Sequence, residues 1–365
     1  MKWSWKLFRF KGIDVNIHAT FALLLIWVAY SYWATSQSIT TTLYGVAFII
    51  ALFTCVLLHE FGHALTAQKY GITTKNITLL PIGGISNLEK MPEKPREELR
   101  VALAGPAVNL GLAAIFAVGM FFTSGFQSFS WSTLISGTIW QKLFAINISL
   151  GLFNLIPAFP MDGGRVLRAA LAARMEFSRA TQIAANIGQL SALIFGFVGL
   201  IYDPLLIFIA LFIWIGASQE SSAAQVKSAL SGIYVSQAMI TKFDTLTPQN
   251  RLGDAVDLIL SGTQQDFPVV QLDQVVGMLT RSDLIKTLSE EGKYVNVQSV
   301  MQKSFTTVNQ TDEIEIAAER LQKCGCKTLP VTDDTGHLVG IITMENIAEF
   351  LMIQSALKRS QNESF

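Results

Sequence analysis

The feature that most constrains this chain is a series of long apolar runs, which fills the first 217 of its 365 residues and then stops. A helix needs about 20 apolar residues to cross the hydrocarbon core of a bilayer. Six runs approach that length: 17–33, 43–67, 99–122, 138–157, 186–201 and 203–217. The sequence therefore predicts a polytopic α-helical membrane protein with about six transmembrane segments. The last two runs are short, and the pattern leaves open whether they cross the bilayer fully.

Lysine and arginine alternate between the connections of these segments. They occur at the N-terminus, in residues 68–98 and after the fourth run, whereas residues 34–42, 123–137 and 202–204 carry none. Lys142, near the outer end of the fourth run, is the exception. Cytosolic loops of membrane proteins carry the excess of basic residues. We therefore expect a multi-pass protein of the cell membrane, surrounded by the lipid bilayer, with both termini in the cytosol.

Two of the basic connections have the pattern of β-strands. Residues 2–18 begin with polar and apolar side chains that alternate at a period of two, and residues 75–89 are β-prone around a Pro-Ile-Gly-Gly break. We interpret both as short strands of a small β-sheet at the cytosolic membrane interface. An interfacial amphipathic arm is the alternative interpretation of residues 2–18.

The segment HEFGH, residues 59–63, places ionisable side chains inside the second apolar run. His59 and His63 share one face of a helix, and this spacing lets two imidazoles hold one Zn²⁺. Glu60 lies beside the first histidine and can act as a general base without ligating the metal. Polar residues that only pack helices are the alternative. A charged residue deep in a membrane helix costs about 2.5–3.5 kcal/mol on insertion scales, which disfavours that alternative.

A zinc site needs a third protein ligand, and the segment NLIPAFPMDGGR, residues 154–165, offers one. Asp162 follows two prolines and precedes two glycines, so the backbone can leave the helix and turn the carboxylate inward. With the orientation above, Asp162 and the histidine pair reach a similar depth near the cytosolic side. A cap for the helix that begins near Arg165 is the alternative role of Asp162.

These motifs resemble those of the site-2 protease family of intramembrane zinc metalloproteases. The resemblance covers roughly residues 12–215 and includes PIGG at 81–84 and AGPAVN at 104–109. The family's usual PLDGG is PMDGG here. The resemblance implies a membrane-embedded protease domain, which we assign to residues 1–217.

The resemblance also implies the roles of the site residues. One Zn²⁺ per chain would be held by His59, His63 and Asp162, and Glu60 would be the general base. The implied substrates are membrane-anchored proteins that are cut in their transmembrane segments.

Four further residues are candidates for contacting the substrate. Asn109 and Asn154 lie near the inner ends of their segments, where an amide can hydrogen bond an oxyanion or the substrate backbone. An amide bond between helices is the alternative. Gly83 and Gly84 lie in a predicted strand whose edge can receive an unwound substrate by β-augmentation. His18 is either a gating or supporting residue or an ordinary interfacial histidine.

Beyond residue 217 the composition becomes that of a soluble domain, and an internal repeat appears. A polar connector, residues 218–232, which we expect to be helical, leads into it. Met239 aligns with Met301, Pro268 with Pro330, Gly277 with Gly340, and Thr280 with Thr343. Each copy is predicted to form a strand, a helix, two strands and a helix. The repeat resembles a cytosolic α/β tandem pair of cystathionine-β-synthase (CBS) domains, which we assign to residues 233–290 and 295–354.

CBS pairs commonly form a cleft for an adenosine nucleotide, which a Thr or Ser contacts together with an Asp three residues later. The first copy keeps both, as Thr280 and Asp283, whereas the second has Thr343 and Asn346. An amide lacks the charge that strengthens a carboxylate acceptor. We therefore expect one good nucleotide site in the first copy and a weak or empty one in the second. A pair that is empty and serves for docking or as a homodimer contact is the alternative.

Composition narrows the other partners. The 27 basic and 27 acidic residues cancel, so bulk charge gives no support to a nucleic-acid partner. Cys324 and Cys326 are too close in sequence for a disulfide between them to cross-link distant parts of the fold. We expect a soluble part with reduced thiols. A metal or redox role for this pair is the weaker alternative.

Two other functions would use the same modules. CBS pairs are also attached to channels and transporters, so a CBS-regulated membrane ion transporter is one alternative. An ion path needs polar residues through both leaflets, whereas the ionisable residues here cluster on the predicted cytosolic side. A zinc-bound scaffold without turnover would have no use for Glu60. The sequence therefore favours the protease.

Overall fold

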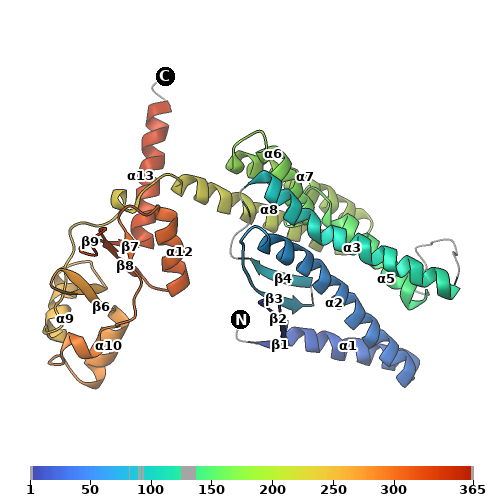
Figure 1. Cartoon of the computed structure of the whole chain (residues 1–365), viewed down its shortest axis with the longest axis horizontal. Coiled ribbons are helices and arrows are strands. Elements are labelled where there is room, and N and C mark those ends of the chain that lie inside the picture. The colour runs from blue at the N-terminus through green and yellow to red at the C-terminus, as the bar shows by residue number, and fades with distance from the viewer. Residues whose placement is uncertain (1–2, 82, 89–91, 93, 125–136, 363–365) are drawn as a thin grey trace. The chain divides into compact units, whose positions relative to one another are not determined.

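A computed structural model of the whole sequence divides the chain into two compact units, Met1–Ala224 and Gln225–Phe365 (Figure 1). It describes residues 3–81, 83–88, 92, 94–124 and 137–362. Most of the predicted outer connection at 123–137 therefore lies outside the described residues, and so does Ile82 of the PIGG motif.

The helices of the first unit follow the predicted apolar runs. Their bounds are α1 (Ala19–Ser36), α2 (Ile39–Gln68), α3 (Pro95–Ser124), α5 (Ile139–Asn154), α6 (Asp162–Ala172), α7 (Phe177–Ile201) and α8 (Leu205–Leu230). Within the described residues, α1, α2, α3, α7 and α8 are long and apolar enough to cross a membrane. Large apolar side chains such as Trp27, Phe197 and Phe208 are exposed on them, as expected of surfaces that face lipid. The predicted helical membrane protein is confirmed.

Two helices extend furthest beyond their predicted segments. Helix α7 begins at Phe177, nine residues before the predicted run, and α8 continues to Leu230. The expected bounds followed hydropathy, whereas the Ala, Ser, Gln and Lys residues after residue 217 are all acceptable in a helix. The predicted connector at 218–232 is therefore mostly the last part of α8. The fourth run forms α5, which has only 16 residues.

Four strands form the small sheet that the sequence predicts. They are β1 (Ser4–Phe10), β2 (Ile13–His18), β3 (Thr74–Leu80) and β4 (Gly83–Leu88), in the order β1-β2-β3-β4. Strands β2 and β3 pair in parallel, and the other two pairs are antiparallel. The interpretation of residues 2–18 as an amphipathic arm is therefore wrong. Ile13, Val15 and Ile77 pack on Phe61 and Ala64 of α2, so the sheet is anchored beside the HEFGH motif.

Helices α2 and α3 pack closely where the motif lies. A side chain at Gly62 of α2 would place its Cβ atom 2.8 Å from the carbonyl oxygen of Ala104 on α3. The absence of a side chain there lets the two backbones approach each other. The short helix α6 packs against α3 and α7. The start of α6 is therefore held near the motif on α2.

The second unit contains the two predicted repeats. The first copy comprises α9 (Leu252–Ser261), β5 (Phe267–Gln271), β6 (Gln274–Leu279) and α10 (Arg281–Glu290). The second comprises β7 (Val308–Asn309), α12 (Ile314–Cys324), β8 (Thr328–Thr332), β9 (Leu338–Thr343) and α13 (Met344–Asn362). A 3₁₀ turn, η1 (Val235–Gln237), and a short helix, α11 (Val297–Val300), precede the copies. The predicted first strand of copy one is reduced to a bridge between Leu246 and Val269.

The two copies exchange their leading segments. Ile240, before the first copy, exchanges two backbone hydrogen bonds with Ile341 of β9, and Gln302 exchanges two with Met278 of β6. In the same way Met239 packs against Gly340, and Met301 against Gly277. Each copy therefore completes the core of the other, which explains why two copies occur together.

One expectation about the second unit is wrong. Cys324 and Cys326 form a disulfide, whereas reduced thiols were expected from the sequence. The intervening Gly325 ends α12 in the left-handed conformation, with φ of 64°, and brings the two Cα atoms to 5.1 Å. That separation lies within the range that a disulfide spans. Spacing along the chain could not reveal this turn.

Candidate active site

Two imidazoles and one carboxylate meet at the C-terminal half of α2. The Nε2 atoms of His59 and His63 are 3.1 Å apart, and they lie 3.2 Å and 3.1 Å from Oδ2 of Asp162. The three residues are 6%, 4% and 7% exposed. The structure thus brings together the three donors that the sequence analysis selected, although 99 residues separate His63 from Asp162.

This arrangement fits a tetrahedral metal ion. Zinc binds nitrogen and oxygen at about 2.0–2.1 Å, so two of its ligand atoms stand about 3.3 Å apart. The observed separations of 3.1–3.2 Å are close to that edge length. Two unprotonated nitrogens and a carboxylate would repel one another at this range without a cation between them. The donor chemistry and the geometry therefore agree with a zinc site.

The remaining nitrogen of His63 orients its ring. Nδ1 of His63 donates to the carbonyl oxygen of Val101 on α3 at 2.7 Å. A proton on Nδ1 leaves the lone pair of Nε2 free for a metal. Nδ1 of His59 is buried and finds no hydrogen-bond partner in the described part of the chain.

Close backbone packing places Asp162 at the start of α6. A Cβ atom at Gly163 would clash with the carbonyl oxygen of Ile156, and one at Gly164 would lie 2.6 Å from the backbone nitrogen of Phe159. The two glycines of the PMDGG motif therefore let the start of α6 pack directly on the backbone of the segment that follows α5. Asp162 is the first residue of α6, and Met161, not Asp162, is its N-cap residue. The alternative role of Asp162 as a helix cap is wrong.

Asp162 is held in its ionised form. Burial acts to raise the pKa of its carboxyl group, but hydrogen bonds from His59 and His63, and the positive charge of these rings when they are protonated, outweigh burial. The pKa of Asp162 therefore lies well below its usual range, and a carboxylate rather than a carboxylic acid faces the histidines.

A cavity of about 740 Å³ contains the three donors and the other predicted site residues. Glu60, Gly83, Gly84, Asn109 and Asn154 all line it. Glu60 lies against β4, since a Cβ atom at Gly84 would be 2.7 Å from Cγ of Glu60. Away from the donors the lining is apolar and includes Leu24, Leu52, Phe153 and Phe212. The cavity therefore suits an apolar peptide segment.

Two polar residues in the cavity have open hydrogen-bonding capacity. Asn109 is 1% exposed, and neither of its amide atoms has a partner among the described residues. Arg165, which the sequence analysis did not select, also lines the cavity, and its Nε atom lacks a partner there. Its position three residues after Asp162, on the same helix face, is the signal that could have revealed it.

His18 does not join the site. It is the N-cap residue of α1, and its Nδ1 atom accepts a hydrogen bond from the backbone nitrogen of Thr20 at 3.3 Å. His18 is not among the residues that line the cavity. Only gating, supporting or interfacial roles of His18 were predicted; the capping role, which satisfies a free backbone donor of α1, was not.

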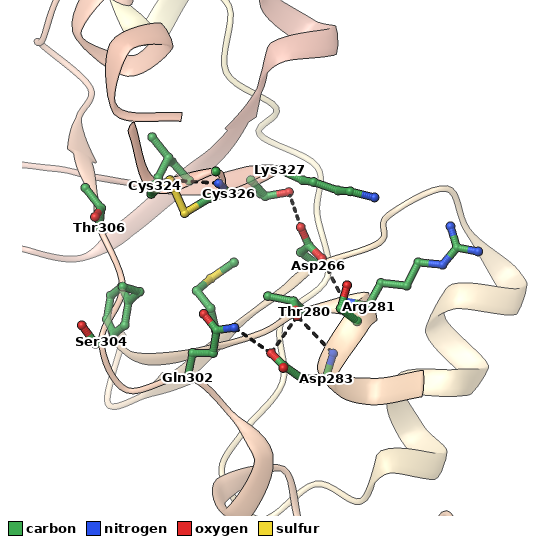
Figure 2. Close-up of a pocket in the computed structure, with 16 residues that line it drawn as sticks. Asp266, Thr280, Arg281, Asp283, Gln302, Ser304, Thr306, Cys324, Cys326 and Lys327 are labelled. Carbon is green, nitrogen blue, oxygen red and sulfur yellow. Dashed lines mark hydrogen bonds between the residues drawn. A yellow bond between two sulfur atoms is a disulfide. The ribbon is translucent and has the colours of Figure 1, made fainter. Parts of the chain in front are cut away.

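A second cavity, of about 460 Å³, lies in the second unit (Figure 2). The Thr280 hydroxyl donates to Asp283 at 2.7 Å, and the Gln302 amide donates to the same carboxylate at 2.8 Å. Figure 2 shows these three residues on one side and the Cys324–Cys326 disulfide on the other. Arg281 and Lys327 add positive charge to the lining. The cavity is thus built from both copies.

The equivalent residues of the second copy are arranged alike. The Thr343 hydroxyl donates to Oδ1 of Asn346 at 2.6 Å, and the Asn346 backbone nitrogen donates back to it at 3.2 Å. Neither residue lines the cavity that holds Thr280 and Asp283.

Comparisons with known proteins agree with both halves. The profile of peptidase family M50 matches residues 47–139 and 129–195, and the CBS domain profile matches 235–290 and 297–353. A zinc metalloprotease of Methanocaldococcus jannaschii is 34% identical over 97% of this chain and 97% of its own. A zinc metalloprotease homologue of Synechocystis sp. is 29% identical over 94% of each chain.

A solved structure, the site-2 protease from Methanocaldococcus jannaschii, is 39% identical, covers 60% of this chain and 95% of its own, and superposes with a TM-score of 0.44. The identity shared along nearly the full length with the curated M. jannaschii relative shows the family. The chain belongs to peptidase family M50, and the predicted class is confirmed: a zinc metalloprotease of the site-2 type with a tandem CBS pair.

The packing around the histidines predicts the effect of one small substitution. A Cβ atom at Gly105 of α3 would lie 2.7 Å from Cε1 of His59 and would clash with the ring of His63. We expect Gly105→Ala to displace both imidazoles and to lower the zinc content of the purified protein at least tenfold. Metal analysis by plasma mass spectrometry measures this.

Gly111→Ala is the matched control, because it lies on the same helix and a Cβ atom there would meet nothing within 4 Å. Full zinc content in both variants would show that the histidines do not need this space.

Proposed function

We propose that this protein hydrolyses peptide bonds within or near the transmembrane segments of membrane-anchored proteins, under control of its CBS pair. The observation that carries the proposal is the buried cluster of His59, His63 and Asp162, which shares an apolar-lined cavity with Glu60. A metalloprotease needs both a metal site and a general base that is not a ligand, and one cavity contains both sets of groups. Lipid and a membrane-embedded protein substrate are the partners that follow.

His59, His63 and Asp162 would hold one Zn²⁺ per chain. When bound, the ion supplies Lewis-acid polarisation of the scissile carbonyl and of the attacking water. Two histidines and one carboxylate are a donor set typical of catalytic zinc sites, in which a water molecule completes the coordination. The name of the Methanocaldococcus jannaschii relative, a zinc metalloprotease, supports zinc as the metal.

Glu60 would be the general base. It neighbours His59 on α2, lines the same cavity and is not one of the three clustered donors. It can take the proton from the attacking water and return it to the leaving amine. A zinc-bound scaffold would not require this group.

Strand β4 would receive the substrate. It lies at the end of the sheet order β1-β2-β3-β4, and Gly83 and Gly84 line the cavity beside Glu60. A transmembrane helix hides its carbonyl groups in hydrogen bonds, so it must unwind before attack, and an edge strand can pair with the unwound backbone. Asn109 and Asn154 would then donate hydrogen bonds to the substrate backbone or the oxyanion.

Substitutions separate the base from the ligands. Glu60→Gln should lower the cleavage rate of a membrane-anchored substrate by about 10²–10⁴-fold while zinc content stays near the wild-type value, because Glu60 is not a ligand. Asp162→Ala should lower both the cleavage rate and the zinc content. Reconstituted full-length protein, assayed with and without a zinc chelator, provides the rates.

Asp203→Asn, at the exposed turn before α8, is the control carboxylate and should change neither quantity. If Asp162→Ala retains a full equivalent of tightly bound zinc, the third ligand lies elsewhere. Unchanged cleavage in Glu60→Gln would remove the proposed base.

Both termini would face the cytosol. The basic connections and the bare connections alternate along the first unit, which supports this orientation. In a cysteine-free variant, Ser36→Cys should react with an impermeant maleimide added outside intact cells, whereas Gln302→Cys should not. Labelling of the variant at Gln302 would contradict the orientation and, with it, the cytosolic depth of the zinc site.

The CBS pair would bind an adenosine nucleotide in the cavity beside Thr280. Asp283 supplies a carboxylate for a ribose hydroxyl, and Arg281 and Lys327 supply charge for phosphate. Nucleotide would alter cleavage because α8 runs from the first unit into the second without interruption. Nucleotide would shift the balance between a more active and a less active conformation of the protein. That shift can be no larger than the difference in nucleotide binding free energy between the two conformations. Homodimerisation through the CBS pair is compatible with this proposal.

Calorimetry on the full-length protein with AMP, ADP and ATP tests the nucleotide site. We expect binding that weakens at least tenfold in Asp283→Ala, since a hydrogen bond to a charged group contributes about 1.5–3 kcal/mol. Asn346→Ala, the matched change in the second copy, should bind as the wild type does. Absence of heat at millimolar nucleotide would reject the site, and a loss confined to Asn346→Ala would place it in the second copy.

A further inference from the structure

A buried charge lies in the second half of the helix that begins with Asp162. Arg168 of α6 is 3% exposed, and its guanidinium contacts two carboxylates from two other helices. Its Nε and Nη2 atoms lie 2.7 Å and 2.6 Å from Oε1 of Glu98 on α3. Its Nη1 atom lies 3.0 Å from Oε2 of Glu220 on α8. A single arginine thus ties α6 to α3 and to α8.

Two aromatic rings enclose the same guanidinium. It lies 5.1 Å from the ring centre of Phe159 and 4.9 Å from that of Phe177, which is the first residue of α7. Both distances are within the range of cation–π attraction. Phe159 belongs to the segment that leads into Asp162, so Arg168 also contacts the chain immediately before the metal-ligating carboxylate.

Helix α6 is short, so its position depends on its contacts with neighbouring elements. It has 11 residues, and Met161 at its N-cap makes no side-chain hydrogen bond. Helices this short are marginal by themselves and depend on tertiary contacts. Asp162 and Arg168 are six residues apart, about 9 Å along the axis. A shift of α6 at Arg168 would therefore be carried to Asp162.

We propose that Arg168 is a positioning residue for the zinc site: clamped between Glu98 and Glu220, it fixes α6 so that the Asp162 carboxylate stays at the two histidines. The inference rests on the proposed zinc site. Removal of a buried charge partner lets the arginine move toward water, because an uncompensated buried charge is costly. Lysine cannot replace arginine here, since an ammonium lacks the planar fork that reaches two carboxylates and stacks on two rings.

Neighbouring charges support the same arrangement. Arg165, which lines the active-site cavity, lies 4.0 Å from Oε1 of Glu220. The two arginines of α6 and the two glutamates therefore balance in charge. Glu220 thereby contacts both Arg168 and a residue that lines the cavity.

Zinc affinity of Arg168→Lys and Glu220→Gln is the decisive measurement. Both should bind zinc about 10- to 100-fold more weakly than wild type in competition with a fluorescent chelator, as supporting residues of metal sites typically do. Their Co²⁺-loaded forms should show altered visible absorption bands, because the carboxylate ligand has moved. Arg174→Gln, an exposed arginine just beyond α6, is the matched control and should stay within about twofold of wild type.

Thermal unfolding of the metal-free proteins distinguishes positioning from simple stabilisation. Variants that melt earlier yet bind zinc with wild-type affinity and an unchanged Co²⁺ spectrum would overturn the proposal. A loss of zinc affinity in Arg174→Gln as large as that in Arg168→Lys would also overturn the proposal. If Arg168→Lys fails to fold, Glu220→Gln decides, because Glu220 is only partly buried. A wild-type protein that binds no zinc would instead reject the zinc site itself.

Discussion

The structure depends on the burial of two imidazoles and one carboxylate among apolar helices. Such groups are costly to bury unless each finds a partner. Here Asp162 contacts both histidines, and a backbone carbonyl on α3 orients His63. Because these partners come from different elements, α2, α3 and α6 must converge at one point. The close glycine contacts and the sheet that packs on α2 are the means by which they converge.

Much of this could be predicted from the sequence. The spacing of His59 and His63 defines a helix face, and the glycines after Asp162 signal a break in the helix, so local patterns were enough to select the three side chains that cluster in the structure. The sheet and the CBS repeat also follow from local patterns: strand alternation and internal alignment. All of these features extend over a few residues or repeat along the chain.

Other features could not be predicted from the sequence. A helical connector was expected at 218–232, but its continuity with the last apolar segment as one helix, α8, was not, because hydropathy falls at residue 217. Burial of Arg168 depends on glutamates 70 and 52 residues away, and nothing in the local sequence marks them as partners. The pairing of Cys324 with Cys326 depends on the left-handed conformation of Gly325. Such features need the three-dimensional structure.

The central claim is that two histidines and one aspartate bind zinc in the membrane unit. Zinc K-edge X-ray absorption of the full-length protein tests it most directly. The account predicts only nitrogen and oxygen neighbours at about 2.0–2.1 Å, with the outer-shell scattering of two imidazoles. Sulfur neighbours near about 2.3 Å would place the metal at cysteines and contradict the account.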